Sequence, residues 1–429
     1  MSRKTVLRTS LNNVFYGGVA TSAMDTLATG PFLIAYALMF GAGNIAIGFL
    51  GSIGFVGNLM HLYSAWLIEQ GKTPKQISVF FSALSRPFYL IAALLAFWAG
   101  SAWALTALIV CFSCTYMIGS VAGGAWLPWM KALVPPKLMG RFFSHRFKWM
   151  MIAKMACYGA GALLIYYFEK DLPDLTIFAY SILLGIAFII GVYGVMTLTR
   201  VENKEVSYQK TQSFFKKTVK TFSNAPFRRL LLFLGVLNFA INFVTPFLTV
   251  YMLKSLSLPM PYVIILTIIS QTAHAFTVKY WGKLADKKNC QSIIRQATPV
   301  FMGCIALFLL CDYIPSATIV LGILALTHVL MGVGQSALTL GMNNISLLHI
   351  PCQDASLYLS VNSVFKSFTS AAGSIIAGVI LTSLEFLGFK AVKMFDLPFE
   401  GTSIGWTFFF ILSLALFMLT FPLIKKVDE

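Results

Sequence analysis

Two short stretches guide the interpretation of the whole chain: PFLIAYAL at 31–38 and PFLTVYML at 246–253. Each lies in a long apolar block, and the second follows the first at an offset of 215 residues. The same offset relates Trp66 to Trp281 and Pro136 to Pro351. Because three pairs share one register at equivalent positions of the hydropathy pattern, the sequence predicts two similar halves. A parallel repeat in a membrane protein implies a binding site between the halves, near the midplane.

The composition is that of a membrane protein. Hydrophobic residues make up 58% of the 429 residues and charged residues 11%, whereas soluble domains carry about 25% charged residues. The apolar blocks are about 20 residues or longer, the length that crosses a bilayer as a helix. We therefore expect an all-α membrane protein with twelve transmembrane helices in two pseudo-twofold-related six-helix bundles. The predicted spans are 12–40, 44–68, 76–99, 103–129, 147–168, 174–199, 227–254, 260–281, 291–311, 315–345, 354–384 and 403–424.

One long polar segment separates the two halves. It covers residues 200–226 and carries Lys204, Lys210, Lys216, Lys217 and Lys220. We expect residues 1–199 to form an N-terminal six-helix bundle, 200–226 a cytoplasmic linker and 227–429 a C-terminal six-helix bundle.

Basic residues predict the orientation. With the N-terminus inside, the outer loops hold only Lys170, Lys254, Lys390 and Lys393, while most of the remaining Lys and Arg face the cytoplasm. The positive-inside rule then places both termini in the cytoplasm of a multi-pass protein of the cell membrane, which we expect to be a bacterial inner membrane. The same rule explains the net charge of +17 without a nucleic-acid partner. The basic N-terminus leads into an apolar stretch too long for a signal peptide, so we expect an uncleaved first span.

Catalytic chemistry finds little support in the sequence. Cys111 and Cys114 form a C-x-x-C inside an apolar block, without a nearby His, and are best interpreted as small residues of a helix. The five His and scattered acids form no Ser/His/Asp set or metal cluster, and no G-x-x-x-x-G-K-[S/T] occurs. We therefore expect no enzyme activity, no cofactor and no metal site. The two-half organisation also disfavours a channel.

With its twelve spans, two halves and basic central linker, the chain resembles the major facilitator superfamily. The family's loop signature is partly met after the eighth span by Gly282, Asp286, Lys287 and Lys288, and departs from the pattern at 289–291. In the first half, Gly71 stands where the signature has its Asp. The resemblance implies that Asp286 helps to set the gating equilibrium. The loop before the fifth span, LVPPKLMGRFFSHR, is similar to a second family pattern and puts Arg141 and Arg146 on the cytoplasmic side.

Four charged residues within spans are the main candidates for the mechanism: Asp25, Arg86, Lys154 and Lys366. A charge at the bilayer centre costs at least about 2.5 kcal/mol on insertion scales, so each needs a reason. All four spans enter from the cytoplasm, and the charges lie roughly 12–20 Å deep at 1.5 Å per residue. Asp25 is the only acid that we expect to be buried in a span, which makes it the candidate for a proton switch. The alternative is an Asp25–Arg86 pair that only fixes two helices.

The cations have open alternatives as well. Lys154 and Lys366 lie on the fifth and eleventh spans, which correspond under the repeat and, by the resemblance, line the cavity. Two such lysines would hold an anion. Lys154, the shallowest, could instead extend to the inner interface, and Lys366 could bond to backbone carbonyls or point to a wet crevice. The third span, which carries Arg86, is peripheral in the family, and this argues against substrate contact.

Neutral polar residues are weaker candidates for the binding site. They are Asn238, Asn242, Gln271, His274, Gln335 and Asn362. Each could equally make a helix–helix hydrogen bond, worth about 0.6 kcal/mol on average.

The second span carries Gly48, Gly51, Gly54 and Gly57. This spacing permits close approach to the eleventh span, as a sliding gate or as simple tight packing.

The sequence therefore favours a secondary transporter that moves a small, anionic organic solute by alternating access, with protons as the coupling ion. We expect it to act as a monomer in the lipid bilayer. The alternative is an antiporter that exports drugs or lipophilic compounds in exchange for protons. Against it, the fifth span has Gly159 and Gly161 but lacks the proline of the motif that such antiporters carry.

Overall fold

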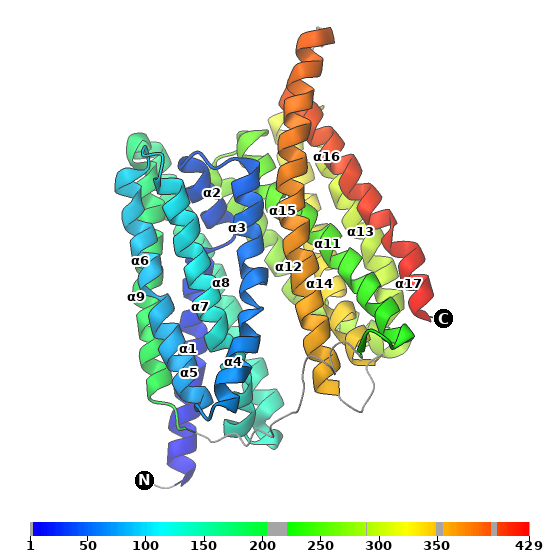
Figure 1. Cartoon of the computed structure of the whole chain (residues 1–429). Helices are drawn as coiled ribbons and strands as arrows, with labels where there is room; N and C mark the ends of the chain where they lie inside the picture. The colour runs from blue at the N-terminus through cyan, green and yellow to red at the C-terminus, as the bar shows by residue number, and fades with distance from the viewer. Residues whose placement is uncertain (1–2, 204–220, 289, 349–354, 396–400, 429) are drawn as a thin grey trace. The chain divides into compact units, whose positions relative to one another are not determined.

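The structure is a computed structural model that describes residues 3–203, 221–288, 290–348, 355–395 and 401–428. The described residues are almost entirely helical and contain no strand (Figure 1). Two compact units divide the chain: residues 1–42 with 53–211, and residues 43–52 with 212–429. The predicted bundle boundaries differ slightly from this division and remain a prediction.

The first unit is built from helices that pack side by side. Within it α1 packs against α8 and α9, and α5 and α4 pack against α7 (Figure 1). Its elements are α1 (Arg3–Ala28), α2 (Pro31–Met39), the end of α3 (Asn44–Gly57), α4 (Met60–Glu69), α5 (Pro74–Ser85), α6 (Pro87–Leu94), the 3-10 turn η1 (Leu95–Trp98), α7 (Ala104–Leu133), α8 (Pro136–Asp171), η2 (Pro173–Leu175) and α9 (Thr176–Thr199).

The second unit is organised around α11, the most deeply buried of the membrane-crossing helices that the structure describes. Helix α11 packs against α15, and α14 packs against both α12 and α13. The elements are α11 (Ala225–Lys254), α12 (Met260–Lys288), α13 (Cys290–Cys311), α14 (Ala317–Leu348), α15 (Ala355–Phe395), α16 (Gly401–Met418) and α17 (Thr420–Asp428).

Among the described residues, eleven helical stretches are long and apolar enough to cross a membrane. The first predicted span, 12–40, is not one of them, and it is broken into α1 and α2. At the break, Gly30 has a positive φ of 60°, which favours glycine. Pro31 follows it at the start of α2, where its missing N–H is not needed. The predicted helix therefore exists, but in two pieces.

Three helices extend past their predicted ends. The segment around Arg141, predicted as a loop, belongs to α8, which begins at Pro136. Residues 282–288, also predicted as a loop, are the last part of α12. Helix α15 continues beyond residue 384, so Glu385 falls inside a membrane-crossing stretch. The expectation that Asp25 is the only acid within a span was therefore wrong, because amphipathic helix ends lack the apolar pattern that marks a span.

The internal repeat is visible in the contacts of two equivalent tyrosines. The hydroxyl of Tyr36 donates to the carbonyl of Ala92 at 2.9 Å, across from α2 to α6. The hydroxyl of its counterpart Tyr251 lies 3.2 Å from the carbonyl oxygen of Phe308, from α11 to α13, and shares its proton with the closer carboxylate of Asp312. Each unit thus has a tyrosine of its first span in contact with a carbonyl of its third, with the two acceptors one residue apart in register. Pro351, which supports the repeat in the sequence, lies outside the described residues.

The glycines at the start of α3 permit helix backbones to touch. Residues 43–52 belong to the second unit, where a Cβ on Gly48 would meet the backbone carbonyl oxygen of Ser374 in α15. A Cβ on Gly378 would likewise lie 3.1 Å from the Cα of Ile45. Helices approach this closely only where both surfaces carry small residues. A sliding role for this contact remains a prediction.

Candidate functional site

The first unit brings three of the four predicted charges together. Asp25 lies on α1, Arg86 at the junction of α5 and α6, and Lys154 on α8. Both cations lie close enough to Asp25 for direct charge interaction. The side chain of Asp25 is exposed, although residues on either side of it along α1 are buried. An accessible carboxylate between two cations can accept a proton or face a charged ligand.

Arg86 reaches this position because the third span breaks beside it. Pro87 has no N–H to continue the helix, so α5 ends at Ser85 and α6 begins at Pro87. A Cβ on Gly191 of α9 would lie 2.9 Å from Cδ of Arg86, so the arginine lies directly against a helix backbone. The buried Nε of Arg86 has no hydrogen-bond partner among the described residues. The third span therefore contributes a charge beside Asp25, and whether Arg86 contacts solute remains a prediction.

Three tyrosines surround the charges, and sequence analysis missed all three. Tyr89 and Tyr116 interact electrostatically with Asp25, and Tyr158 presents its ring 5.8 Å from Nζ of Lys154. A hydrogen bond joins the Tyr116 hydroxyl to the side chain of Thr29, which donates to the backbone carbonyl of Asp25 at 2.6 Å. Hydroxyl groups can relay a proton or bind a polar solute. No sequence signal distinguishes these tyrosines from others in apolar blocks.

The cluster belongs to one half of the repeat only. At the 215-residue offset, the positions of Asp25, Arg86 and Lys154 are occupied by Ala240, Phe301 and Thr369. Ala240 and Phe301 are buried. The cluster of Asp25, Arg86 and Lys154 is therefore specific to the first unit. The equivalent helices of the second unit fold without these charges.

In the second unit, Lys366 is a half-buried residue of α15, and no carboxylate pairs with it in the described part of the chain. Nearby on α11, Asn242 donates to the backbone oxygen of Asn238 at 2.8 Å and to Oγ of Ser370 on α15 at 3.1 Å. Asn238 donates to the backbone oxygen of Leu234 at 2.7 Å. Both amides therefore make hydrogen bonds within or between helices. Such bonds are the alternative to solute binding that was considered for them from the sequence.

The other polar candidates lie on several helices of this unit. Gln271 and His274 are partly buried on α12, and each has an interaction partner. Gln335 is partly buried on α14. Asn362 is buried on α15, with its Oδ1 unpartnered among the described residues. Glu385, which sequence analysis missed, accepts a hydrogen bond of 2.7 Å from Nδ2 of Asn44.

The predicted gating residues lie at helix ends. Gly282 and Lys287 are on the last turns of α12, with Lys287 exposed, and Arg141 is exposed on α8. Asp286 belongs to the same part of α12, but its side chain lies outside the described residues. The role expected of Asp286 therefore stays a prediction.

Among the described residues, no group of three metal-ligating side chains is present.

Comparison with known proteins identifies the fold. No family model matches the sequence, and no curated protein matches it. Solved structures do match over almost the whole chain. A mutant form of the nucleoside transporter NupG is 12% identical, with a TM-score of 0.73 over 98% of this chain and 100% of its own. A D-xylose–proton symporter is 11% identical, with a TM-score of 0.71 over 97% of both chains. A bacterial homologue of the iron transporter ferroportin, in an inward-facing state, is 13% identical, with a TM-score of 0.67 over all of both chains.

The chain therefore has the fold of the major facilitator superfamily, as its repeat and hydropathy predicted. With eleven helical stretches able to cross a membrane among its described residues, it is a multi-pass membrane protein. The matched proteins are named for different solutes, and the identities are too low to transfer any one of them. The subfamily is not defined by these comparisons.

Proposed function

We propose that this chain is a secondary active transporter that moves a small anionic organic solute by alternating access, coupled to protons. The observation that carries the proposal is the cluster of Asp25, Arg86 and Lys154 in the first unit. The structurally similar proteins, among them a nucleoside transporter and a D-xylose–proton symporter, support a transporter. Their fold allows alternating access by rocking of two repeats around a fixed site. The distribution of Lys and Arg supports a position in the cell membrane with both termini in the cytoplasm. The transporter acts as a monomer in this proposal.

The charge balance supports an anionic solute. Arg86, Lys154 and Lys366 lie within membrane-crossing stretches, and Asp25 is the carboxylate that acts on the first two. Glu385 does not offset them, because it is hydrogen-bonded to Asn44 and the cation that acts on it is Lys254. An excess of positive charge in a low-dielectric region is costly. A bound anion would neutralise the excess and would gain charge-assisted hydrogen bonds.

Proton coupling is assigned to Asp25. Its carboxylate is accessible, and two cations act on it. When an anionic solute binds the cations, their hold on Asp25 weakens and the carboxyl group takes up a proton more readily. Solute and proton would then bind together and leave together, which is the requirement for symport. The hydroxyl groups of Tyr89 and Tyr116 lie beside this carboxylate as candidate proton relays.

The test is a ligand screen by thermal shift on the purified protein in phosphate-free buffer. A solute that binds only the folded state raises the apparent Tm. We expect the stabilising compounds to be organic anions, and Lys366→Gln to lose most of the shift. Lys279→Gln is the matched control, since Lys279 is an exposed lysine of the same unit on α12.

Two results would overturn the proposal. One is a screen in which only cations or neutral lipophilic compounds stabilise the wild-type protein, which would support the efflux alternative. The other is an organic anion whose shift is the same in Lys366→Gln and Lys279→Gln, which would remove Lys366 from the binding site.

A further inference from the structure

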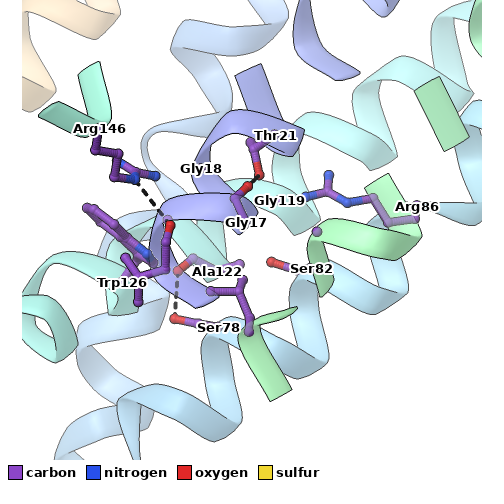
Figure 2. Close-up of a pocket in the computed structure, with 14 residues that line it drawn as sticks. Gly17, Gly18, Thr21, Ser78, Ser82, Arg86, Gly119, Ala122, Trp126 and Arg146 are labelled. Atoms are coloured by element: carbon purple, nitrogen blue, oxygen red, sulfur yellow. Dashed lines mark hydrogen bonds between the residues drawn. The ribbon is translucent and has the colours of Figure 1, made fainter. Parts of the chain in front are cut away.

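A cavity of about 180 Å³ lies in the first unit, with Arg86 and Arg146 among its lining residues and Asp25 not among them. Helices α1, α5, α7, α8 and α9 enclose it (Figure 2). At about 30 Å³ per water molecule, this volume corresponds to roughly six waters. It is therefore large enough for a small polyatomic ion, and too small for a typical drug-sized ligand.

Two guanidinium groups line the cavity. Figure 2 shows Arg146 and Arg86 entering from opposite sides, with α1 between them. The other labelled polar groups are the hydroxyls of Thr21, Ser78 and Ser82. None of the described residues that line the cavity is acidic. The cavity thus has a net positive lining with hydroxyl groups between the two charges.

Both guanidiniums have N–H donors to offer a ligand. Arg146 uses Nε to donate to the carbonyl of Val14 at 3.3 Å and stacks over the ring of Trp126 at 4.8 Å. These contacts fix the plane of the guanidinium beside the cavity that it lines. Arg86 has a buried Nε without a partner among the described residues. A guanidinium carries five N–H donors, and leaving them buried and unpaired is unfavourable.

Glycines shape the cavity to hold these groups. A Cβ on Gly18 of α1 would collide with the guanidinium of Arg146, and a Cβ on Gly191 would collide with Arg86. Further glycines line the same space: Gly119, Gly123 and Gly194. The two arginines are therefore seated against helix backbones, in positions that larger residues would forbid.

We propose that this cavity binds a small oxyanion of the phosphate or sulfate class. Planar guanidiniums bind the oxygens of such ions through paired, charge-assisted hydrogen bonds. The hydroxyl of Ser82, which lines the cavity, supplies a further donor. The site differs from the solute site of the proposed function, since Arg146 does not belong to the charge cluster around Asp25.

The test uses the purified full-length chain and inorganic phosphate. Thermal shift is measured against phosphate concentration at constant pH and ionic strength, with chloride replacing phosphate in a parallel series. We expect phosphate to raise the apparent Tm of the wild type more than chloride does. Arg146→Gln should weaken phosphate binding roughly tenfold or more, because a charge-assisted bond is lost. Arg146→Lys should recover part of it.

Lys148→Gln is the matched control, because it removes the same charge from an exposed position of α8. It should bind phosphate like the wild type. If Arg146→Gln does not fold, Ser82→Ala serves instead, with an expected loss of a few-fold. Equal phosphate shifts in the wild type and in the cavity variants would overturn the proposal, as would equal shifts with phosphate and chloride. Neither result would bear on the organic solute, whose test rests on Lys366.

Discussion

Arg86 shows how one side chain depends on the residues around it. Its side chain crosses Gly191 of α9 where the glycine lacks a Cβ, with Cδ 2.9 Å from the place where that atom would be. The same Cβ would lie 2.7 Å from Sδ of Met24, next to Asp25. A methyl group at this position would therefore move both the guanidinium and the helix that bears the carboxylate.

We predict that Gly191→Ala destabilises the protein by about 1–3 kcal/mol, the usual cost of overpacking, and lowers transport. Gly185→Ala on the same helix is the control, since a Cβ there meets nothing within 4 Å. The control should be neutral or slightly stabilising, because alanine favours a helix over glycine. Thermal unfolding in detergent measures the difference. Equal effects of the two substitutions would contradict the packing described for Arg86.

Arg86 both lines the cavity and acts on Asp25, and this leads to a second prediction. The carboxylate and an oxyanion in the cavity compete for one guanidinium. Asp25→Asn should therefore tighten phosphate binding several-fold, since the competing charge is removed. A phosphate titration by thermal shift measures it. Unchanged phosphate binding in the Asn variant would show that the two sites are not linked through Arg86, and weaker binding would contradict the competition.

The charged residues of the site could be predicted from the sequence, and its other residues could not. Charges in apolar blocks are rare and costly, so Asp25, Arg86 and Lys154 could be selected from sequence alone, and the structure brings them together. The tyrosines could not be selected, because tyrosine is common in membrane helices and carries no charge. The cavity between Arg86 and Arg146 could not be foreseen either. Arg146 was assigned to a loop, and glycines give no sign of what they face.

At the scale of elements, one polar contact fastens α11 to the end of α13. Tyr251 donates to Oδ1 of Asp312 at 2.7 Å, and Ser255 donates to the same oxygen at 3.4 Å. Asp312 lies just past the membrane-crossing stretch that ends at Cys311. Burial raises the pKa of its carboxyl group above the usual value, and the two hydrogen bonds oppose that shift without cancelling it.

The sign of the pH dependence follows from this. A carboxyl group whose pKa is higher in the folded state binds protons more tightly there, so its contribution to stability is present at low pH and is lost as the pH rises. Asp312→Asn keeps an acceptor for Tyr251 and removes the charge. We predict that the Tm of the Asn variant, relative to the wild type, rises between about pH 4 and about pH 7. A Tm difference that is flat or falls over this range would refute the assignment.

The helices themselves were predicted well, apart from their ends. Apolar blocks identify the part of a helix that lies in the membrane, and they do not identify continuations in water. The segments around Arg141 and Asp286 were assigned to loops for this reason. The break between Gly30 and Pro31 could have been foreseen, because glycine before proline is a strong helix-ending signal.

At the scale of the whole molecule, the fold could be inferred from two features of the sequence. These are the three pairs of residues at one offset and the twelve apolar blocks. The two tyrosine bonds, Tyr36 to Ala92 and Tyr251 to Phe308, show that the offset reflects equivalent packing. The charges do not follow the repeat, since the second half has Ala240, Phe301 and Thr369 in their place. We interpret this difference as the separation of a common scaffold from the proton coupling, which we assign to the first half.

The central claim is that Asp25 couples solute movement to protons. The direct test compares wild type and Asp25→Asn, reconstituted to equal density in liposomes, with a labelled solute obtained from the ligand screen. With an imposed pH gradient, the wild type should accumulate the solute above equilibrium, and Asp25→Asn should not. Without a gradient, both should exchange labelled for unlabelled solute, because exchange needs no net proton movement. Undiminished accumulation by Asp25→Asn would contradict the account.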